Sequence, residues 1–188
     1  YTGNTTVADG TLRLGASNAL PAGTNVLVSG EGDGVTALLD LNGHDSSVAS
    51  LTLGGATATS GAEILTGAGT LTLGGDVSYS SSNTPLGAII RGNLSLGSVN
   101  RDFNIGDSTT ATDDLTVEAN ISGSGGLIKS GFGQLFASGD HSYGGETTVN
   151  TGVLALSGNN VNATGGTSVN TGGVVRYDAP SAIHGSTR

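Results

Sequence analysis

The sequence predicts an all-β protein built from stacked coils, a parallel β-solenoid, and three observations lead to this fold class. Short apolar–polar–apolar triplets recur along the chain, Gly residues stand between them, and large side chains are rare. Of the 188 residues 34 are Gly and 4% are aromatic, and the chain has no Cys, Met or Trp. A thin core of stacked Leu, Val and Ile rows fits this composition better than the layers of an ordinary globular domain.

The triplets have the alternation of short β-strands. Residues i and i+2 of a strand share one face, so each triplet points two apolar side chains inward and its polar residue outward. Gly and β-branched residues disfavour helices, and no segment shows a sustained helical period. The sequence LTLGG occurs at 51–55 and at 71–75, and related triplets are Leu12–Leu14, Leu39–Leu41, Leu94–Leu96, Phe103–Ile105 and Leu154–Leu156.

Strands this short, joined by Gly, Asn or Asp, leave no room for crossover helices, so each coil must pair with the coils above and below it. The step between the two LTLGG copies predicts coils of about 20 residues and a rod on the order of 45 Å long. A longer repeat lies over the short one, because Tyr1–Leu14 matches Tyr143–Leu156 at the Tyr, the Thr-Thr-Val, two Gly and both Leu positions.

Three other classes of structure are compatible with parts of this pattern. An antiparallel sandwich would use many tight hairpins, of which Asn42-Gly43 is one of few candidates. A Ca²⁺-loaded roll would repeat a Gly-rich nonapeptide, whose nearest match, Gly30–Gly34, occurs once. A disordered chain would lack the regular aliphatic pairs.

The charge of the chain limits its partners. The formal net charge is −9, with Lys129 as the single Lys and five Arg. Nucleic-acid binding requires clustered cations, so we expect no nucleic-acid partner, and an acidic surface disfavours anionic membranes. No apolar run has the length of a membrane span, so no direct membrane insertion of this segment is expected. The lack of Cys fits a chain that crosses a bacterial envelope unfolded, because premature disulfides would hinder that passage.

The stretch from Ile121 to Leu156 resembles the autotransporter-associated β-strand repeat of large bacterial surface proteins. Its elements are Gly-Ser-Gly-Gly-Leu, then Lys-Ser-Gly-x-Gly-x-Leu at 129–135, Tyr-x-Gly-x-Thr-Thr-Val and Gly-x-Leu-x-Leu, and Tyr1–Leu14 carries the last two again. The resemblance implies a right-handed parallel β-helix with Gly-rich turns, exported to the cell surface and anchored in the outer membrane through regions outside these residues. Residues 1–188 would then form a single solenoid segment of a longer passenger, with loop insertions around 76–114, where the pattern weakens.

No catalytic or cofactor-binding residues are predicted, and the resembled family carries no common catalytic set. The densest charged group combines Arg101 with four carboxylates in a Ser/Thr-rich loop, where a solvated turn is the main expectation. Clustered carboxylates also suit a hard cation, so the metal-site candidates are Asp102, Asp107, Asp113 and Asp114. The pairs His44-Asp45 and Asp140-His141 point their members to opposite faces, and His184 stands alone, so His offers no metal site.

These observations predict a structural rod of a bacterial surface-exposed, autotransporter-type protein rather than an enzyme. The rod would serve as a stalk, or as an adhesin whose polar flank associates with itself or with host and matrix glycans and proteins. The alternative is a polysaccharide-cleaving β-helix enzyme. That activity would need a cleft lined by carboxylates and aromatic platforms, which the sequence does not indicate.

Overall fold

The structure is a computed structural model that describes residues 2–31, 34–54, 60–82, 86–109, 111–160 and 163–180. Within these ranges the named elements are 18 β-strands, and every strand pair is parallel. The predicted all-β parallel solenoid is therefore confirmed, and an antiparallel sandwich is excluded for this part of the chain. None of the described segments is a helix long and apolar enough to cross a membrane.

Two long sheets run the length of the rod and a short third side closes it. The first sheet has eight strands: β1 (Thr5–Val7), β3 (Asn25–Val28), β6 (Ser50–Leu53), β8 (Val77–Tyr79), β10 (Arg101–Ile105), β13 (Leu127–Ser130), β15 (Thr147–Val149) and β17 (Thr167–Val169). The second has β2 (Thr11–Arg13), β4 (Ala37–Asp40), β7 (Ala62–Leu73), β9 (Ala88–Ser95), β11 (Leu115–Val117), β14 (Gln134–Ala137), β16 (Gly152–Leu156) and β18 (Gly173–Tyr177). The third side is formed by β5 (Ser46–Val48), β12 (Asn120–Ser122) and the second halves of β7 and β9.

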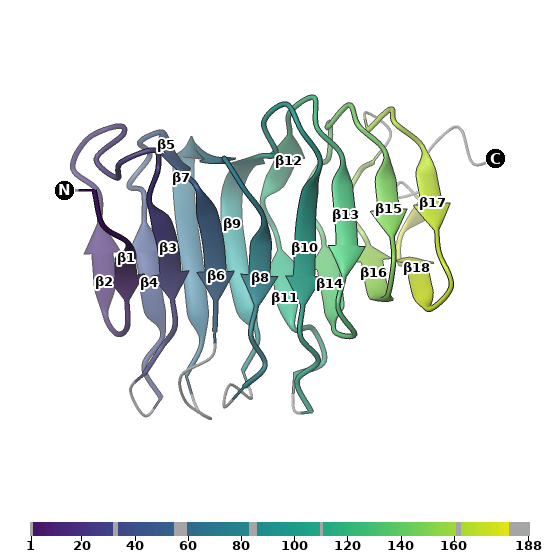
Figure 1. Ribbon diagram of the computed structural model, residues 1–188, viewed down its shortest axis with the longest axis horizontal. Helices are drawn as coiled ribbons and strands as arrows, with labels where there is room; N and C mark the ends of the chain where they lie inside the picture. The colour runs from purple at the N-terminus through teal and green to yellow at the C-terminus, as the bar shows by residue number, and fades with distance from the viewer. Residues whose placement is uncertain are drawn as a thin grey trace.

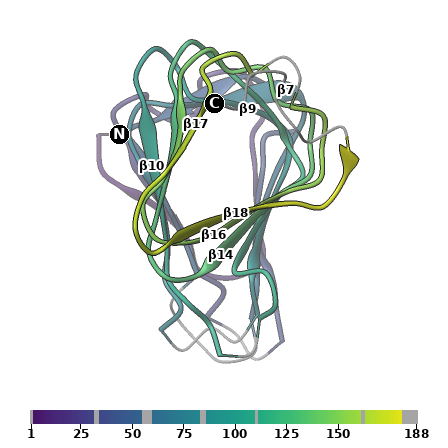
Figure 2. The same cartoon turned by 90° about the vertical axis from the view of Figure 1, so that its right-hand side faces the viewer.

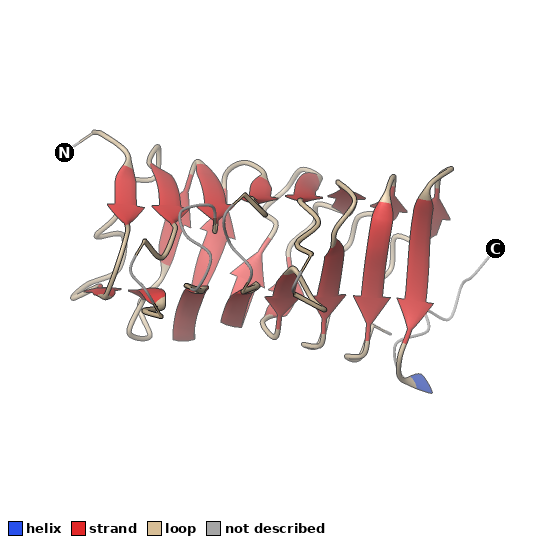
Figure 3. Ribbon diagram, turned by 90° about the horizontal axis from the view of Figure 1, so that it is seen from below, coloured by secondary structure: helices blue, strands red, loops and turns tan. Residues whose placement is uncertain are grey.

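The strands stack along one axis, with the first sheet toward the viewer and the second behind it (Figure 1). Seen along that axis, the coils lie over one another and enclose one continuous interior (Figure 2). The view from below separates the two long sheets and the connections between them (Figure 3). This arrangement gives the molecule two broad outer faces and a row of turns at each corner.

The predicted coil length of 20 residues is wrong for most of the rod. Val26, Leu51, Val77, Phe103 and Lys129 occupy one position in successive strands, at steps of 25 or 26 residues, and steps of 20 follow to Val149 and Val169. The two LTLGG copies lie on different sides of the rod, because Leu51 belongs to β6 and Leu71 pairs with Ser46 on the third side. Eight strands spaced by about 4.8 Å make the stack about 34 Å long, shorter than the 45 Å expected.

The coils differ in length at the corner that joins the first sheet to the second. This connection spans residues 8–10 in the first coil, then 29–36, 54–61, 80–87 and 106–114, and shortens to 131–133 and 150–151. Two of the long connections lie within 76–114, where the sequence predicts insertions, and two lie before it. The described parts of these four long connections extend toward the lower edge of Figure 1, and the short connections before β14 and β16 end above it.

The core consists of vertical columns of inward side chains, as the triplets predict. One column of the second sheet holds Leu39, Ile64, Ile90, Val117, Ala137 and Leu156, and one of the third side holds Leu71, Leu94 and Ile121. Both apolar residues of each triplet are buried, apart from the half-buried Leu12 in the first coil. The Asn42-Gly43 turn is tight, with positive φ at both residues, but it leads from β4 to β5 and is no hairpin.

Two cations lie inside this aliphatic core and bind backbone carbonyls instead of acids. The fully buried Lys129 takes the column position of Phe103 and Val149, and its Nζ donates to the carbonyls of Ser130, Gly131 and Thr151 at 2.7, 2.8 and 3.3 Å. Arg101 donates from Nε to Leu96 O at 2.8 Å and from Nη1 to Gly74 O at 2.7 Å. Each cation ties its own coil to a neighbour, because carbonyls of two coils share it.

Removal of one core side chain should weaken the whole stack. Leu94 is fully buried between Leu71 and Ile121. We expect Leu94→Ala to lower the free energy of unfolding by about 2–5 kcal/mol, because the lost methyl groups leave a cavity that neighbouring coils cannot fill. Urea unfolding followed by circular dichroism measures this loss. The control Val99→Ala removes an exposed side chain and should stay within about 0.5 kcal/mol, and equal losses for both variants would contradict the column model.

The buried Lys129 should make stability rise with pH in the alkaline range. Burial lowers the pKa of Lys129 from 10.5 to about 8, with Asp114 and Asp102 opposing that shift. Between these values the unfolded chain binds more protons than the folded one, so the free energy of unfolding increases with pH. Relative to Lys129→Met, which cannot titrate, the wild type should gain roughly 2 kcal/mol between pH 7 and pH 9.5 in urea unfolding. A difference that stays flat or falls over this range would show that the ammonium group is not buried.

Candidate functional site

The outer face of the first sheet carries mostly short polar side chains arranged in ladders, with Leu27 and Ile128 as apolar exceptions. Ser78 Oγ donates to Thr52 Oγ1 at 3.0 Å, Ser50 Oγ donates to Asn25 Oδ1 at 2.8 Å, and Asn170 Nδ2 donates to Asn150 Oδ1 at 2.8 Å. These bonds join equivalent positions of neighbouring coils and hold the side chains in register. The outward residues form two rows along the rod axis, with one residue of each row in every coil. The first row consists of Asn4, Asn25, Ser50, Asp76, Asp102, Ile128, Thr148 and Ser168. The second row consists of Thr6, Leu27, Thr52, Ser78, Asn104, Ser130, Asn150 and Asn170.

A shallow hollow of about 300 Å³ interrupts this face over β6, β8 and β10. Its outward side chains are three hydroxyls, one amide and two carboxylates, and the backbone of Leu51 and Val77 forms part of its floor. Backbone pairing places these strands side by side at the centre of the first sheet (Figure 1). The outward side chains that line the hollow are Ser50, Thr52, Asp76, Ser78, Asp102 and Asn104.

Asp76 and Asp102 give the hollow its electrostatic character. The backbone N–H of Asp102 donates to Asp76 Oδ1 at 2.9 Å, which places the two carboxyl groups on adjacent strands. Burial raises the pKa of Asp102 and the charge of Asp76 raises it further, while the Ser130 hydroxyl and Lys129 lower it. The Oδ1 atom of Asp102 is buried and accepts no hydrogen bond. Because that atom has no accessible surface, a ligand in the hollow would meet the other carboxyl oxygens of Asp102 and Asp76.

The outer face of the second sheet is different, because its charges are paired. Arg91 lies between Glu63 and Glu118, with Nε 2.8 Å from Glu63 Oε1 and Nη1 2.5 Å from Glu118 Oε2. Arg13 Nε is 2.7 Å from Asp40 Oδ2. A second hollow, of about 290 Å³, lies at the corner of this sheet and is lined largely by apolar atoms, among them the half-exposed Leu86 and Ile89.

The structure separates one of the four predicted metal-site carboxylates, Asp102, from the other three. Asp102 is on the outer face of β10, whereas Asp113 and Asp114 precede β11 in the second sheet and Asp107 is exposed after β10. Among the described residues there is no group of three or more His, Asp or Glu side chains placed to hold a metal ion. No cation is assigned here, and the cation site stays a prediction.

Part of this charged group is buried instead of lying in a solvated turn. Asp114 accepts from the backbone N–H of Ser108 at 2.6 Å and of Gln134 at 2.8 Å, so it fastens the long connection to the next coil. Burial raises the pKa of Asp114, the two backbone hydrogen bonds lower it, and Asp107 raises it again. Gln134 also donates a side-chain hydrogen bond to Asp113. Asp114 is thus a structural residue, and Asp107 is the exposed carboxylate beside it.

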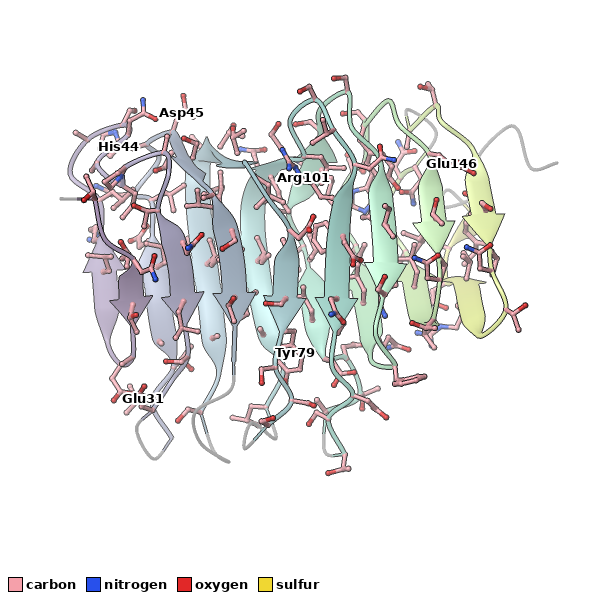
Figure 4. The ribbon with its side chains drawn as sticks, viewed as in Figure 1. Glu31, His44, Asp45, Tyr79, Arg101 and Glu146 are labelled. Carbon is pink, nitrogen blue, oxygen red and sulfur yellow. The ribbon has the colours of Figure 1, made fainter. Side chains whose placement is uncertain are left out.

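The two His-Asp pairs lie apart from the hollow. His44 and Asp45 are at the upper edge in Figure 4, where Asp45 Oδ1 accepts from the backbone N–H of Thr70 at 2.8 Å. His141 is buried and continues the column of Ile121, whereas Asp140 is exposed. His184, Gly32 and Asp33 lie outside the described residues.

The sequence pattern does not single out Asp76, Ser78 or the burial of Lys129. Each outward residue of the hollow is an ordinary middle residue of a strand triplet or its flank. The signal that groups them is the 25- or 26-residue step between strands, which the LTLGG spacing obscures. The strand alternation does contain a signal for the burial of Lys129. Lys129 follows the inward-facing Leu127 by two residues, so the two side chains share the inner face of the strand.

Comparison with known proteins gives one family match and one relative. The model of the passenger-associated-transport-repeat matches residues 1–14, 64–84 and 127–156. The chain is 31% identical over 188 residues to the adhesin BmaC autotransporter of Brucella suis biovar 1 (strain 1330). That similarity covers 94% of this chain and 4% of the relative, so the chain spans a small part of the length of the protein that it matches.

No solved structure gives a significant match. The matched repeats coincide with strands of the solenoid, since residues 1–14 contain β1 and β2 and residues 127–156 contain β13 to β16. The resemblance found in the sequence is therefore confirmed. Together with the parallel β-solenoid, the repeats and the relative support an autotransporter passenger region that carries passenger-associated-transport-repeats.

Proposed function

We propose that this chain is a stretch of the stiff rod of a surface-exposed autotransporter-type protein, and that the outer face of its first sheet is adhesive. The observation that carries the proposal is the ladder of short polar side chains along β1 to β17, held in register by hydrogen bonds between coils. The relative is named an adhesin, which supports an adhesive and non-enzymatic role at the cell surface.

The rod itself provides the mechanical part of this function. Backbone hydrogen bonds of both sheets run parallel to the rod axis, so bending the rod must stretch many of them at once. Each coil is stabilised by its neighbours, which makes a long passenger stiffer and more stable than a short one. Such a rod holds its outer face at a distance from the membrane and presents the same face repeatedly.

The first sheet is the better candidate for adhesion because its outward carboxyl groups have no cationic side chain beside them on the same face. On the second sheet the described Arg residues Arg13, Arg91 and Arg176 each have an acidic partner. On the first sheet the outward positions include Asp76 and Asp102 and contain no Lys or Arg. A surface with free acceptors can form hydrogen bonds with a second rod or with a host glycan or protein.

Concentration-dependent association of the purified chain tests the adhesive role. In sedimentation velocity the wild type should associate, or be captured by immobilised glycans or matrix proteins. Thr148→Glu places a negative charge on the outer face of β15 and should weaken self-association of the chain by roughly tenfold, because like charges meet when the acidic faces of two rods approach. The matched control Thr116→Glu changes the outer face of β11 and should leave it unchanged.

The opposite results have distinct meanings. A chain that neither associates nor is captured at high concentration would be a passive stalk, and the adhesive part of the proposal would be abandoned. Equal effects of Thr148→Glu and Thr116→Glu would exclude the first sheet as the specific surface.

A further inference from the structure

The hollow over β6, β8 and β10 is a depression on the first sheet that short side chains leave among the ladders. Its volume of about 300 Å³ is at the lower end of the range for sites of small ligands, which extends from about 300 to 1,000 Å³. It would therefore hold a short segment of a longer molecule. Along the rod axis, Asn25 and Ser130 continue the polar ladder on either side of the hollow.

We propose that this hollow binds a glycan that carries free amino groups, with Asp76 and Asp102 binding an ammonium group and the hydroxyls and amide around them binding sugar hydroxyls. This inference rests on the proposed adhesive role of the first sheet and names the ligand of that face. The residues in contact would be Ser50, Thr52, Asp76, Ser78, Asp102 and Asn104.

The charge of the hollow selects a donor-rich, positive ligand. Two carboxyl groups lie on adjacent strands, and none of the outward side chains described on this sheet is a Lys or Arg. The charge of the nearby Asp76 raises the pKa of Asp102, so the two carboxyl groups repel each other when both are ionised. An ammonium group against the pair would remove that repulsion, which an anionic or purely apolar ligand could not do.

The strand arrangement favours a glycan over a basic peptide. β6, β8 and β10 are interior strands whose two edges are both paired, so a peptide cannot add to them as a further strand. The outward side chains of the hollow are short and polar, and none is a long aliphatic or aromatic side chain against which the stem of Lys or Arg could pack. Hydroxyl and amide groups at fixed spacing instead match the many hydroxyls of a sugar chain.

Binding of two oligosaccharides that differ only in their amino groups tests the proposal. Calorimetry with the full chain should show saturable binding of a glucosamine oligomer, and binding of the N-acetylglucosamine oligomer of equal length should be at least about tenfold weaker. Asp102→Asn and Asp76→Asn should each weaken binding of the glucosamine oligomer by at least about tenfold. Circular dichroism of each variant verifies that the solenoid is intact.

Controls separate a specific site from attraction to an acidic rod. Glu146 is exposed at a turn remote from the hollow (Figure 4), and Glu146→Gln removes the same charge, so it should leave affinity within about twofold. Oligolysine of equal charge should not compete with the sugar. An equal loss in Glu146→Gln and Asp102→Asn, equal affinity for both oligosaccharides, or full competition by oligolysine would each overturn the proposal.

The failure of this inference is distinguishable from failure of the adhesive role. A chain that still associates with itself or with matrix proteins, but does not bind the glucosamine oligomer, would disprove the glycan site and leave the adhesive face standing. If Asp102→Asn loses both activities and its circular dichroism shows that it is unfolded, Ser78→Thr serves as the second variant. It keeps the hydroxyl, adds a methyl group to the hollow and should weaken sugar binding on its own, and unchanged binding would overturn the proposal.

Discussion

Each coil of this rod must lay its inward side chains directly over those of the coil before it, because the interior is too thin to be filled in any other way. The parallel hydrogen bonds between strands fix the height of each step, and the columns of Leu, Val and Ile fill the space between steps. Glycines stand where two backbones approach closely: a Cβ at Gly158 would lie 1.7 Å from Gly139 O. The identities of the inward-facing residues and of these glycines are therefore determined by the stacking of the coils.

The sequence predicts which residues face inward but not which strands are neighbours. In the sequence repeat, Val7 corresponds to Val149. The pairing of strands, however, places Thr5 and not Val7 in the column of Val149. The residues of this column between the two are Lys129, Phe103, Val77, Leu51 and Val26. Leu156 likewise leads back to Leu12, and the repeat equates it with Leu14. The offset is two residues on both sheets, so every inward residue stays inward. The alternation of inward and outward residues, with its period of two, specifies the face on which a side chain lies. It does not specify the register between neighbouring strands.

The same limit explains why the candidate site is not visible in the sequence. Ser50, Ser78 and Asn104 are separated by one or two coils, and their proximity depends on the coil length that the repeated LTLGG misstates. Of the four predicted carboxylates, Asp102 lies on the outer face of β10, whereas Asp107, Asp113 and Asp114 lie in the connection that follows this strand. Equivalent residues of neighbouring coils around the hollow are 25 or 26 positions apart in the sequence. A local sequence motif does not reveal such pairs.

Stacking uses the inner face of each strand and the proposed recognition uses the outer face, and this separation determines how such a rod can vary. An inward change such as the replacement of an aliphatic residue by Lys129 must be compensated within the interior, here by three backbone carbonyls. An outward change on β6, β8 or β10 meets solvent and ladder neighbours alone, so it alters the surface at small cost to the fold. A ligand-binding hollow can therefore arise on a long rod wherever two or three neighbouring coils carry suitable outward residues, without any change in the core beneath them.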